Sequence, residues 1–174
     1  MSSRINSGAL VIAVVLLVVP ATTGAMFHQY SRVPATVERV IDGDTLVVRG
    51  GAHVRLVQID APEAGEECYA GASTRELARL AGAGSRVELE IDPALDDVDR
   101  YGRLLRYIHA GTRNVNLELV RRGAATPWFY GGDRGRYAAR FLTATSAARA
   151  AKRGMWGACR VSWRPDSPVD TRPR

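Results

Sequence analysis

Four short polar clusters follow one another between residues 42 and 103 of this 174-residue chain. They combine carboxylates with arginines, and they are Asp42-Gly43-Asp44-Thr45, Arg55, Asp60-Ala61-Pro62-Glu63 and Asp99-Arg100-Tyr101-Gly102-Arg103. Carboxylates bind a hard metal ion, and guanidinium groups hold a phosphate and neutralise the charge that develops on it. Each cluster alone is weak evidence, whereas the ordered set predicts a site that cleaves phosphodiesters with a metal ion.

The acidic clusters supply candidate metal ligands. Asp44 begins one expected strand and Asp60 follows the end of another, so a hairpin would bring their carboxylates together. Water, a backbone carbonyl and a phosphate oxygen would complete the shell of a hard divalent ion, and Glu63 could orient or deprotonate a water. The alternative is a pair of ordinary turns with solvated acids. A calcium-binding EF-hand is excluded, because His53 stands where that loop needs its bidentate glutamate.

The arginines and the tyrosine have two interpretations each. Arg55 lies five residues before Asp60, so strand alternation places the two on opposite faces unless the strand bends or bulges. Without a bend, Arg55 would point to solvent. Arg103 follows Gly102 at the entrance of a strand and would otherwise be an ordinary surface arginine. Tyr101 could stack on a base or pack on the rim of a barrel.

The sequence predicts a small barrel with about three helices. Alternation and turn residues favour five strands, at Thr36–Ile41, Thr45–Val48, Ala52–Ile59, Arg86–Ile91 and Leu104–His109. Helical patterns cover Ser73–Leu80, then Leu117–Arg122 with Asn116 as its cap, and a last long segment from Asp133 to Gly154. Five strands with one helix between the third and fourth are typical of a Greek-key barrel of the OB type.

The two ends of the chain differ in composition from its middle. Arg4 precedes an apolar run from Ala9 to Val19, which is too short to span a bilayer and favours a signal peptide over residues 1–25, with a short membrane anchor as the alternative. Residues 26–35 are expected to be a linker and residues 36–160 the folded domain. Residues 161–174 contain three prolines and no apolar periodicity, which predicts a disordered tail.

Cysteines and net charge give supporting evidence. Cys68 and Cys159 are the only cysteines, and an exported chain allows a disulfide between them, with two free thiols as the alternative. The formal net charge is +6, carried almost entirely by arginine. A polyanionic partner would favour such an excess, but so would a genome rich in G and C.

The clusters together resemble the staphylococcal (micrococcal) nuclease family over about Thr36–Trp156. The resemblance is carried by Ile41-Asp42-Gly43-Asp44-Thr45, Arg55-Leu56, Ile59-Asp60-Ala61-Pro62-Glu63, Asp99-Arg100-Tyr101-Gly102-Arg103 and Asn116-Leu117-Glu118-Leu119-Val120-Arg121. It implies an OB-fold barrel and an enzyme that hydrolyses DNA and RNA with Ca²⁺ and leaves 3′-phosphate ends. With the signal-like N-terminus, we expect a secreted or extracytoplasmic protein, and we expect a monomer. Membrane contact is expected only if the N-terminal segment is retained.

The resemblance also implies roles for individual residues. Asp44, Asp60 and the carbonyl of Ala61 would ligate the metal. Glu63 would act as general base or orient the water, while Arg55 and Arg103 would clamp the phosphate. Two further positions, Arg100 and Tyr101, match those that hold the terminal phosphate and sugar of the nucleotide.

One part of the site departs from the family pattern. After Gly123 the tyrosine that packs on the base has no secure counterpart, and Trp128, Phe129 or Tyr130 could replace it. The rival hypothesis for the whole chain is a non-catalytic OB-fold module that binds nucleic acid by stacking and charge. All five catalytic and metal-binding side chains are present, which favours the enzyme.

Overall fold

A computed structural model describes residues 32–65 and 67–174 of the chain. The predicted signal peptide or anchor at residues 1–25 lies outside the described residues. Residues 32–35 do not belong to a linker, because they already pair in the first strand of the barrel. Within the part of the chain that the structure describes, no helix has the length and apolar character needed to cross a membrane.

The predicted five-stranded OB-type barrel is confirmed. Strands run in the order β3-β2-β1-β5-β6-β7, and a parallel pairing between β3 and β6 closes the sheet on itself. Their bounds are β1 Arg32–Val40, β2 Thr45–Val48, β3 His53–Leu56, β5 Arg86–Glu90, β6 Leu104–Ala110 and β7 Arg113–Asn114. Every side chain of β2 is buried, and Leu46, Val54 and Ile108 are among those that fill the interior.

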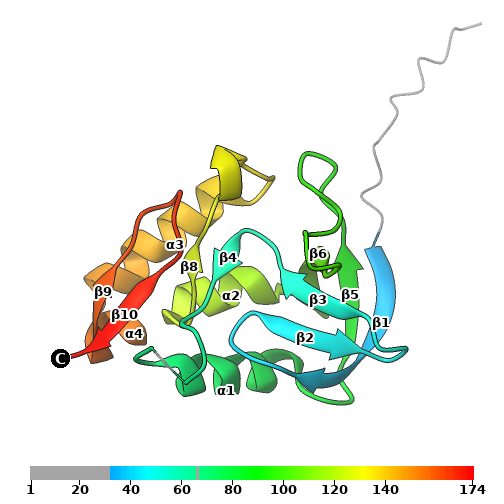
Figure 1. The fold of residues 1–174 in the computed structure, drawn as a ribbon, viewed down its shortest axis with the longest axis horizontal. Coiled ribbons are helices and arrows are strands. Elements are labelled where there is room, and N and C mark those ends of the chain that lie inside the picture. The colour runs from blue at the N-terminus through cyan, green and yellow to red at the C-terminus, as the bar shows by residue number, and fades with distance from the viewer. Residues whose placement is uncertain (1–31, 66) are drawn as a thin grey trace, which may run out of the picture.

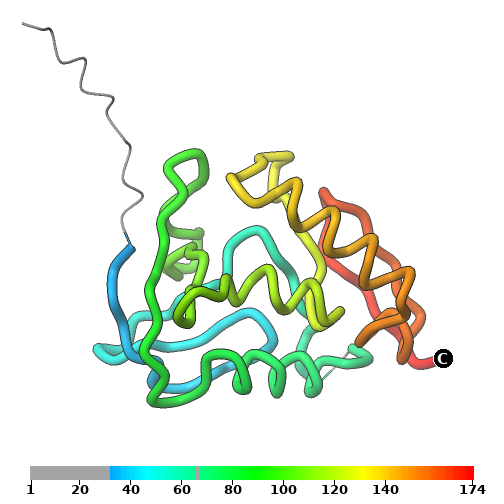
Figure 2. The backbone as a smooth tube through the Cα atoms, turned by 180° about the vertical axis from the view of Figure 1, so that it is seen from behind, coloured from blue at the N-terminus to red at the C-terminus, as the bar shows by residue number. Residues whose placement is uncertain are grey.

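Three longer helices accompany the barrel, as predicted. They are α1 Ala70–Ala81, α2 Val115–Arg122 and α3 Ala138–Ala150, with a single turn η1 at Tyr130–Gly132 and a short α4 at Met155–Ala158. Figure 1 shows the barrel at one end of the molecule and α3 at the other. Seen from behind in Figure 2, α2 crosses the middle of the molecule, where it contacts α1, α3 and β6.

The start of α2 differs from the prediction. Asn114, not Asn116, caps the helix by accepting a hydrogen bond from the backbone N–H of Leu117. Asn116 is fully buried, and its amide accepts from the N–H of Ile108 and donates to the carbonyl of Val57. Both asparagines suit a cap by local preference, so packing against the barrel decided between them.

The last long helix begins later than predicted. Residues 133–137 do not start α3 because Gln58 holds them against the barrel: its amide donates to the carbonyl of Asp133 and accepts from the N–H of Gly135. A Cβ at Gly135 would lie 2.4 Å from the hydroxyl of Tyr107, so only glycine fits there. The buried face of α3 carries Phe141, Ala144, Thr145 and Ala148.

The prediction of a disordered tail at residues 161–174 is wrong. Strands β9 (Cys159–Ser162) and β10 (Asp170–Pro173) form an antiparallel pair, which we call the C-terminal hairpin. A second small pair joins β4 (Ile59–Asp60) to β8 (Thr126–Pro127). The predicted disulfide between Cys68 and Cys159 is present, with 6.1 Å between the Cα atoms. The sequence of these short strands shows no clear alternation of polar and apolar residues. Contacts with distant parts of the chain keep them ordered.

Candidate active site

A bend in the third predicted strand brings Arg55 to Asp60. The expected strand Ala52–Ile59 is divided into β3 and β4, and Gln58 between them has a left-handed φ of 64°. As a result, Nη2 of Arg55 lies 2.9 Å from Oδ1 of Asp60, and Nη1 donates to the carbonyl of Ile59 at 2.8 Å. Only 9% of Arg55 is exposed, so the interpretation as a solvent-facing arginine is wrong.

The hairpin of β2 and β3 adds Asp44 to this pair. Thr45 is the cross-strand partner of Arg55, which leaves Asp44 beside the guanidinium, with 3.2 Å between Nη2 and Oδ2. Asp44 also accepts hydrogen bonds from the hydroxyl of Thr45 and, at 2.9 Å, from the backbone N–H of Ala61. Gly43 makes this approach feasible, because a Cβ there would lie 2.5 Å from Cβ of Ala61. We call Asp44, Arg55 and Asp60 the inner cluster.

The inner cluster carries more negative than positive charge. Burial, the largest cause, raises the pKa of Asp60 to about 7, and the charge of Asp44 adds to this while Arg55 opposes it. Burial and then the charge of Asp44 likewise raise the pKa of Asp42 and of Glu63. One guanidinium therefore does not offset the carboxylates around it, and a bound cation would favour their charged forms.

The donor set fits a hard cation that takes part of its shell from elsewhere. Within residues 32–65 and 67–174, no three His, Cys, Asp or Glu side chains are arranged to hold a metal by themselves. The inner cluster offers two oxygen ligands, Asp44 and Asp60, next to the backbone of Ala61. Oxygen-only donors with room for water and a phosphate oxygen suit Ca²⁺ or Mg²⁺ rather than a thiophilic metal.

Arg103 is fixed by the turn that precedes it. The carboxylate of Asp99 accepts from the backbone N–H groups of Tyr101 and Arg103, and from Nε of Arg103 at 2.7 Å. Gly102 supplies the positive φ of this turn. Since Asp99 uses only Nε, the Nη groups of Arg103 have no hydrogen-bonding partner among the described residues. They are therefore available to a phosphate.

Tyr101 stands out from the surface rather than packing on the barrel. It is 67% exposed and lies between two guanidiniums, with that of Arg100 at 4.7 Å and that of Arg103 at 5.4 Å from its ring centroid. Arg100 also donates to the tyrosine hydroxyl at 2.6 Å. This arrangement suits contacts with a nucleotide phosphate and its sugar or base.

A pocket of about 340 Å³ joins these residues to the inner cluster. Its walls include Arg55, Asp99, Tyr101, Arg103, Trp128 and Tyr130. The rings of Trp128 and Tyr130 meet edge to face at 5.7 Å, whereas Phe129 is only 1% exposed and belongs to the core. Phe129 is thereby excluded as the residue that packs on a base, and Trp128 and Tyr130 remain. We call Arg100, Tyr101, Arg103, Trp128 and Tyr130 the outer rim.

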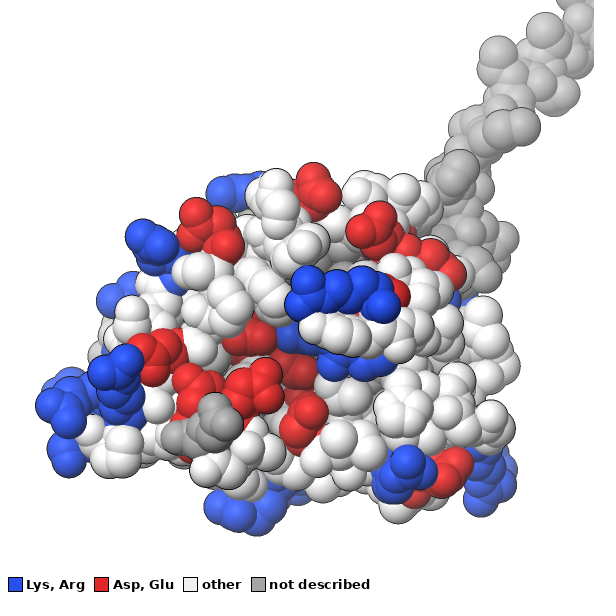
Figure 3. Space-filling model, in the orientation of Figure 1, with Lys and Arg blue, Asp and Glu red and all other residues white. Residues whose placement is uncertain are grey.

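Glu63 is less tightly placed than the inner cluster. It is exposed, and its backbone N–H donates to Oε2 of Glu67 at 2.7 Å. Figure 3 shows acidic side chains gathered around a hollow near the middle of one face, with basic side chains beside them. Glu63 is close enough for the charges of Asp44 and Asp42 to affect its pKa. It is therefore near the inner cluster without being bound to it.

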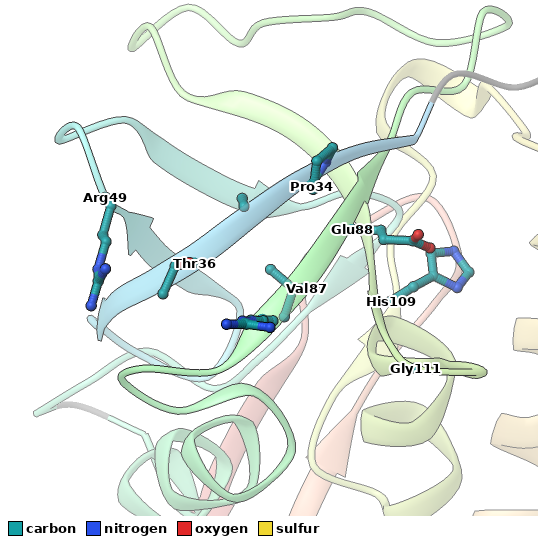
Figure 4. A pocket seen from close by; sticks show the side chains of 9 residues that line it. Pro34, Thr36, Arg49, Val87, Glu88, His109 and Gly111 are labelled. Atoms are coloured by element: carbon teal, nitrogen blue, oxygen red, sulfur yellow. The ribbon is translucent and has the colours of Figure 1, made fainter.

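Another hollow, on the outer surface of β1 and β5, lacks this chemistry. It measures about 640 Å³, and Figure 4 shows that its lining includes Pro34, Thr36, Arg49, Glu88 and His109. Glu88 is its only carboxylate, and at Oε2 it pairs with Arg32 at 3.3 Å. A larger volume without paired carboxylates gives no metal site, so the smaller pocket is the candidate active site.

Sequence reasoning missed two residues of the site, Gln58 and Val169, and did not single out a third, Trp128. Gln58 makes the bend and lines the pocket, Trp128 lies with its ring centroid 5.3 Å from the guanidinium of Arg55, and the N–H of Val169 donates to Oδ2 of Asp60 at 2.8 Å. A left-handed glutamine and a backbone amide 109 residues away leave no local pattern. Trp128 was one of three aromatic candidates, and only its burial and position could select it.

Comparisons with known proteins agree with this geometry. Residues 53–158 match the family described as "Staphylococcal nuclease homologue". Micrococcal nuclease from Shigella flexneri is 33% identical over 144 residues, which is 76% of this chain and 76% of that protein. Endonuclease YncB from Bacillus subtilis is 28% identical over 137 residues (74% and 64%), and Thermonuclease from Staphylococcus intermedius is 33% identical over 102 residues (54% and 59%).

The chain therefore belongs to the staphylococcal nuclease family, and it is an enzyme that hydrolyses phosphodiester bonds of nucleic acids. This confirms the resemblance that the ordered clusters predicted. The family match begins at residue 53 and ends at residue 158, so Asp44 and the C-terminal hairpin lie outside it.

Proposed function

We propose that this protein is an exported, Ca²⁺-dependent nuclease that cuts both DNA and RNA with low sequence specificity and leaves 3′-phosphate ends. The observation that carries the proposal is the bridge of Arg55 between two buried carboxylates, at the wall of a pocket whose rim holds Arg103 and exposed aromatic rings. A site built this way places the two phosphate donors, Arg55 and Arg103, at one pocket, with the proposed metal ligands directly behind Arg55.

Asp44, Asp60 and the carbonyl of Ala61 would hold the metal. A bound Ca²⁺ would supply charge neutralisation and polarisation of the phosphate. The preference for a hard ion is supported by the oxygen-only donor set and by the surplus of carboxylates around Arg55.

The protein side chains would divide the remaining work. Glu63, whose pKa is raised by partial burial and by Asp44, would orient the attacking water and accept its proton. Arg55 and Arg103 would hold the non-bridging oxygens, and their hydrogen bonds would strengthen as charge develops on the five-coordinate phosphorus. The 5′-oxygen would leave opposite the incoming water, so the phosphate would stay on the 3′ side.

Low specificity follows from the chemistry of the outer rim. Guanidiniums recognise phosphate, which is the same in every nucleotide, and aromatic faces stack on any base. Tyr101 and Tyr130 are both largely exposed and provide such faces. The rim offers few fixed acceptors for reading a base edge, which supports action on DNA and RNA alike.

Export and a monomeric state complete the proposal. The disulfide between Cys68 and Cys159 is of the kind that persists in an oxidising compartment, and it agrees with the signal-like N-terminal sequence. The inner cluster and the outer rim come from a single chain, so the site needs no second subunit.

A digestion assay tests the proposal. Purified protein is incubated with single- and double-stranded DNA and with RNA, in millimolar Ca²⁺ or in a Ca²⁺ chelator, and the product ends are mapped. We expect cleavage of all three substrates with Ca²⁺ and none with the chelator. Intact substrates in Ca²⁺, together with binding to single strands, would instead establish a non-catalytic OB-fold module.

A further inference from the structure

The C-terminal hairpin reaches the active site although it lies outside the family match. The turn between its strands carries Val169, whose backbone N–H donates to Oδ2 of Asp60 at 2.8 Å. The amide and the carboxylate are both buried. A buried N–H without a hydrogen-bond partner costs free energy, so this amide is held in its hydrogen bond to Asp60.

This hydrogen bond completes the restraint on Asp60. Arg55 holds Oδ1 at 2.9 Å, and Val169 holds Oδ2 from the other side. A contact on each oxygen fixes the rotation of the carboxylate about its Cβ–Cγ bond. Because a carboxylate oxygen has two lone pairs, each oxygen keeps one for a further partner. The carboxylate of Asp60 is thus oriented, and each of its oxygens can still accept a further partner.

A second path leads from the hairpin to Glu63. The N–H of Thr171 donates to Oε1 of Glu67 at 2.9 Å, and Oε2 of Glu67 accepts from the N–H of Glu63 at 2.7 Å. The hydroxyl of Thr171 donates to the carbonyl of Cys68 at 2.7 Å. Glu67 therefore links the hairpin to the backbone of Glu63, which is otherwise exposed.

The hairpin is attached firmly enough to act as a support. The disulfide joins its first residue, Cys159, to Cys68. The indole N–H of Trp163 donates to the carbonyl of Pro127 at 2.7 Å, and the carbonyl of Pro165 accepts from the N–H of Phe129 at 2.7 Å. Figure 1 shows the hairpin beside α3, with β10 starting near β8 and running from there toward the C-terminus.

We propose that residues 159–173 form a positioning element of the active site, in which the amide of Val169 orients Asp60 and Thr171 orients Glu63 through Glu67. This inference rests on the proposed Ca²⁺-dependent nuclease function. Partners of metal ligands outside the coordination shell typically change metal affinity or activity by about 10- to 100-fold when they are removed. The hairpin would supply two such partners from a segment beyond the family core.

Two variants, Val169→Pro and Glu67→Gln, test the two paths, and Val169→Ala is the control for the first. Val169→Pro removes the N–H and the valine side chain, and Val169→Ala removes the side chain alone. We expect Val169→Pro to weaken Ca²⁺ binding by about 10-fold or more, measured by isothermal titration calorimetry, with Val169→Ala staying near the parent.

Glu67→Gln keeps the size of the side chain but replaces one acceptor oxygen with an NH₂ group. We expect it to lower kcat by about 10-fold while the Kd for Ca²⁺ stays within about twofold.

The results separate this inference from the function on which it rests. A parent protein that neither binds Ca²⁺ nor cleaves nucleic acid would refute the proposed function. A parent that does both, with equal Ca²⁺ affinity in Val169→Pro and Val169→Ala and an unchanged kcat in Glu67→Gln, would overturn the positioning role alone. If Val169→Pro does not fold, Glu67→Gln decides the matter through kcat and Kd.

Discussion

The inner cluster and the outer rim meet at one pocket, which Arg55 lines together with the rim, but they are built in opposite ways. Each member of the inner cluster is at most 9% exposed, and its oxygens and nitrogens are already bound to one another. In the outer rim, Tyr101 and Tyr130 are more than 60% exposed, and the Nη groups of Arg103 have no hydrogen-bonding partner within the described residues. The inner cluster is organised before substrate arrives, whereas the rim still has donors and aromatic faces to offer.

This difference separates the chemical step from binding. Changing a buried, mutually bonded group disturbs every partner that it has, in a setting where electrostatic interactions are weakly screened. Changing an exposed group removes mainly its own contact with substrate. We therefore expect effects on kcat and on metal affinity from the inner cluster, and effects on KM from the aromatic part of the rim.

The largest effect is expected from Asp44→Asn. The substitution keeps the side-chain volume but removes a charged hard ligand, so Ca²⁺ affinity and kcat should each fall by about 100-fold or more. The fold should persist, because an asparagine oxygen can still accept from the N–H of Ala61. Calorimetry and a digestion assay measure the two losses, and an unchanged Ca²⁺ dependence would place the metal elsewhere.

Arg55→Lys and Arg103→Lys compare one arginine from each region. Lysine keeps the charge but lacks the planar fork, so each should lose about 3–4 kcal/mol of transition-state stabilisation, which is about 100- to 1000-fold in kcat. Only Arg55→Lys should also lower the free energy of unfolding, because Arg55 bridges two buried carboxylates. Kinetics together with denaturant titration of both variants would reveal this contrast.

Arg86→Lys is the matched control for these two variants. Arg86 is exposed on β5 and has no ion-pair partner among residues 32–65 and 67–174. The kcat and the free energy of unfolding of Arg86→Lys should therefore equal those of the parent. If Arg55→Lys and Arg103→Lys behave like this control, the assigned phosphate clamp is wrong.

The raised pKa of Asp60 predicts opposite responses to pH for stability and for metal binding. Its folded value of about 7 lies above its ordinary value of 3.8, so the folded chain holds an extra proton between these limits. In a Ca²⁺ chelator, this contribution to stability is complete below about pH 4 and is lost as the pH rises through 7. Ca²⁺ competes with that proton, so its apparent affinity should fall about tenfold for each pH unit below 7.

Asp60→Asn provides the control for the pH experiment. It should make the pH slope of denaturant unfolding in chelator smaller by the contribution of Asp60, while Asp42 and Glu63, whose pKa values are also raised, keep theirs. If the parent and Asp60→Asn instead show the same pH dependence of stability in chelator between pH 5 and pH 8, the Asp60 carboxyl is charged in the folded state without metal.

The smallest effect is expected from Tyr101→Ala in the outer rim. Stacking on an aromatic face contributes about 1–3 kcal/mol per base, so KM should rise by about 5- to 150-fold at an unchanged Ca²⁺ affinity and a nearly unchanged kcat. Steady-state kinetics on a short single-stranded DNA gives both constants. A fall in kcat as large as that of Arg103→Lys would show that the aromatic part of the rim also takes part in chemistry, and the distinction between that part and the inner cluster would fail.

Local sequence determined most of the barrel and indicated the side chains of the candidate site. The barrel strands β2 and β6, which lie between turn residues, were predicted close to their observed bounds. The clusters around Asp44, Asp60 and Arg103 predicted side chains that the structure brings close together, since metal and phosphate chemistry would require those side-chain types. Gly123 correctly ended α2, since its left-handed conformation is a local property.

Contacts between distant residues decided the rest. Neither the hydrophobic periodicity nor the conformational propensities of the residues indicated the left-handed turn at Gln58. This turn brings Arg55 onto the face of Asp60. The same holds for the choice of Asn114 over Asn116 as helix cap, and for the order of the C-terminal hairpin. In each case the deciding free energy comes from satisfying buried polar groups across the fold, such as the amide of Val169 with Asp60, and that pairing exists only when the whole chain has folded.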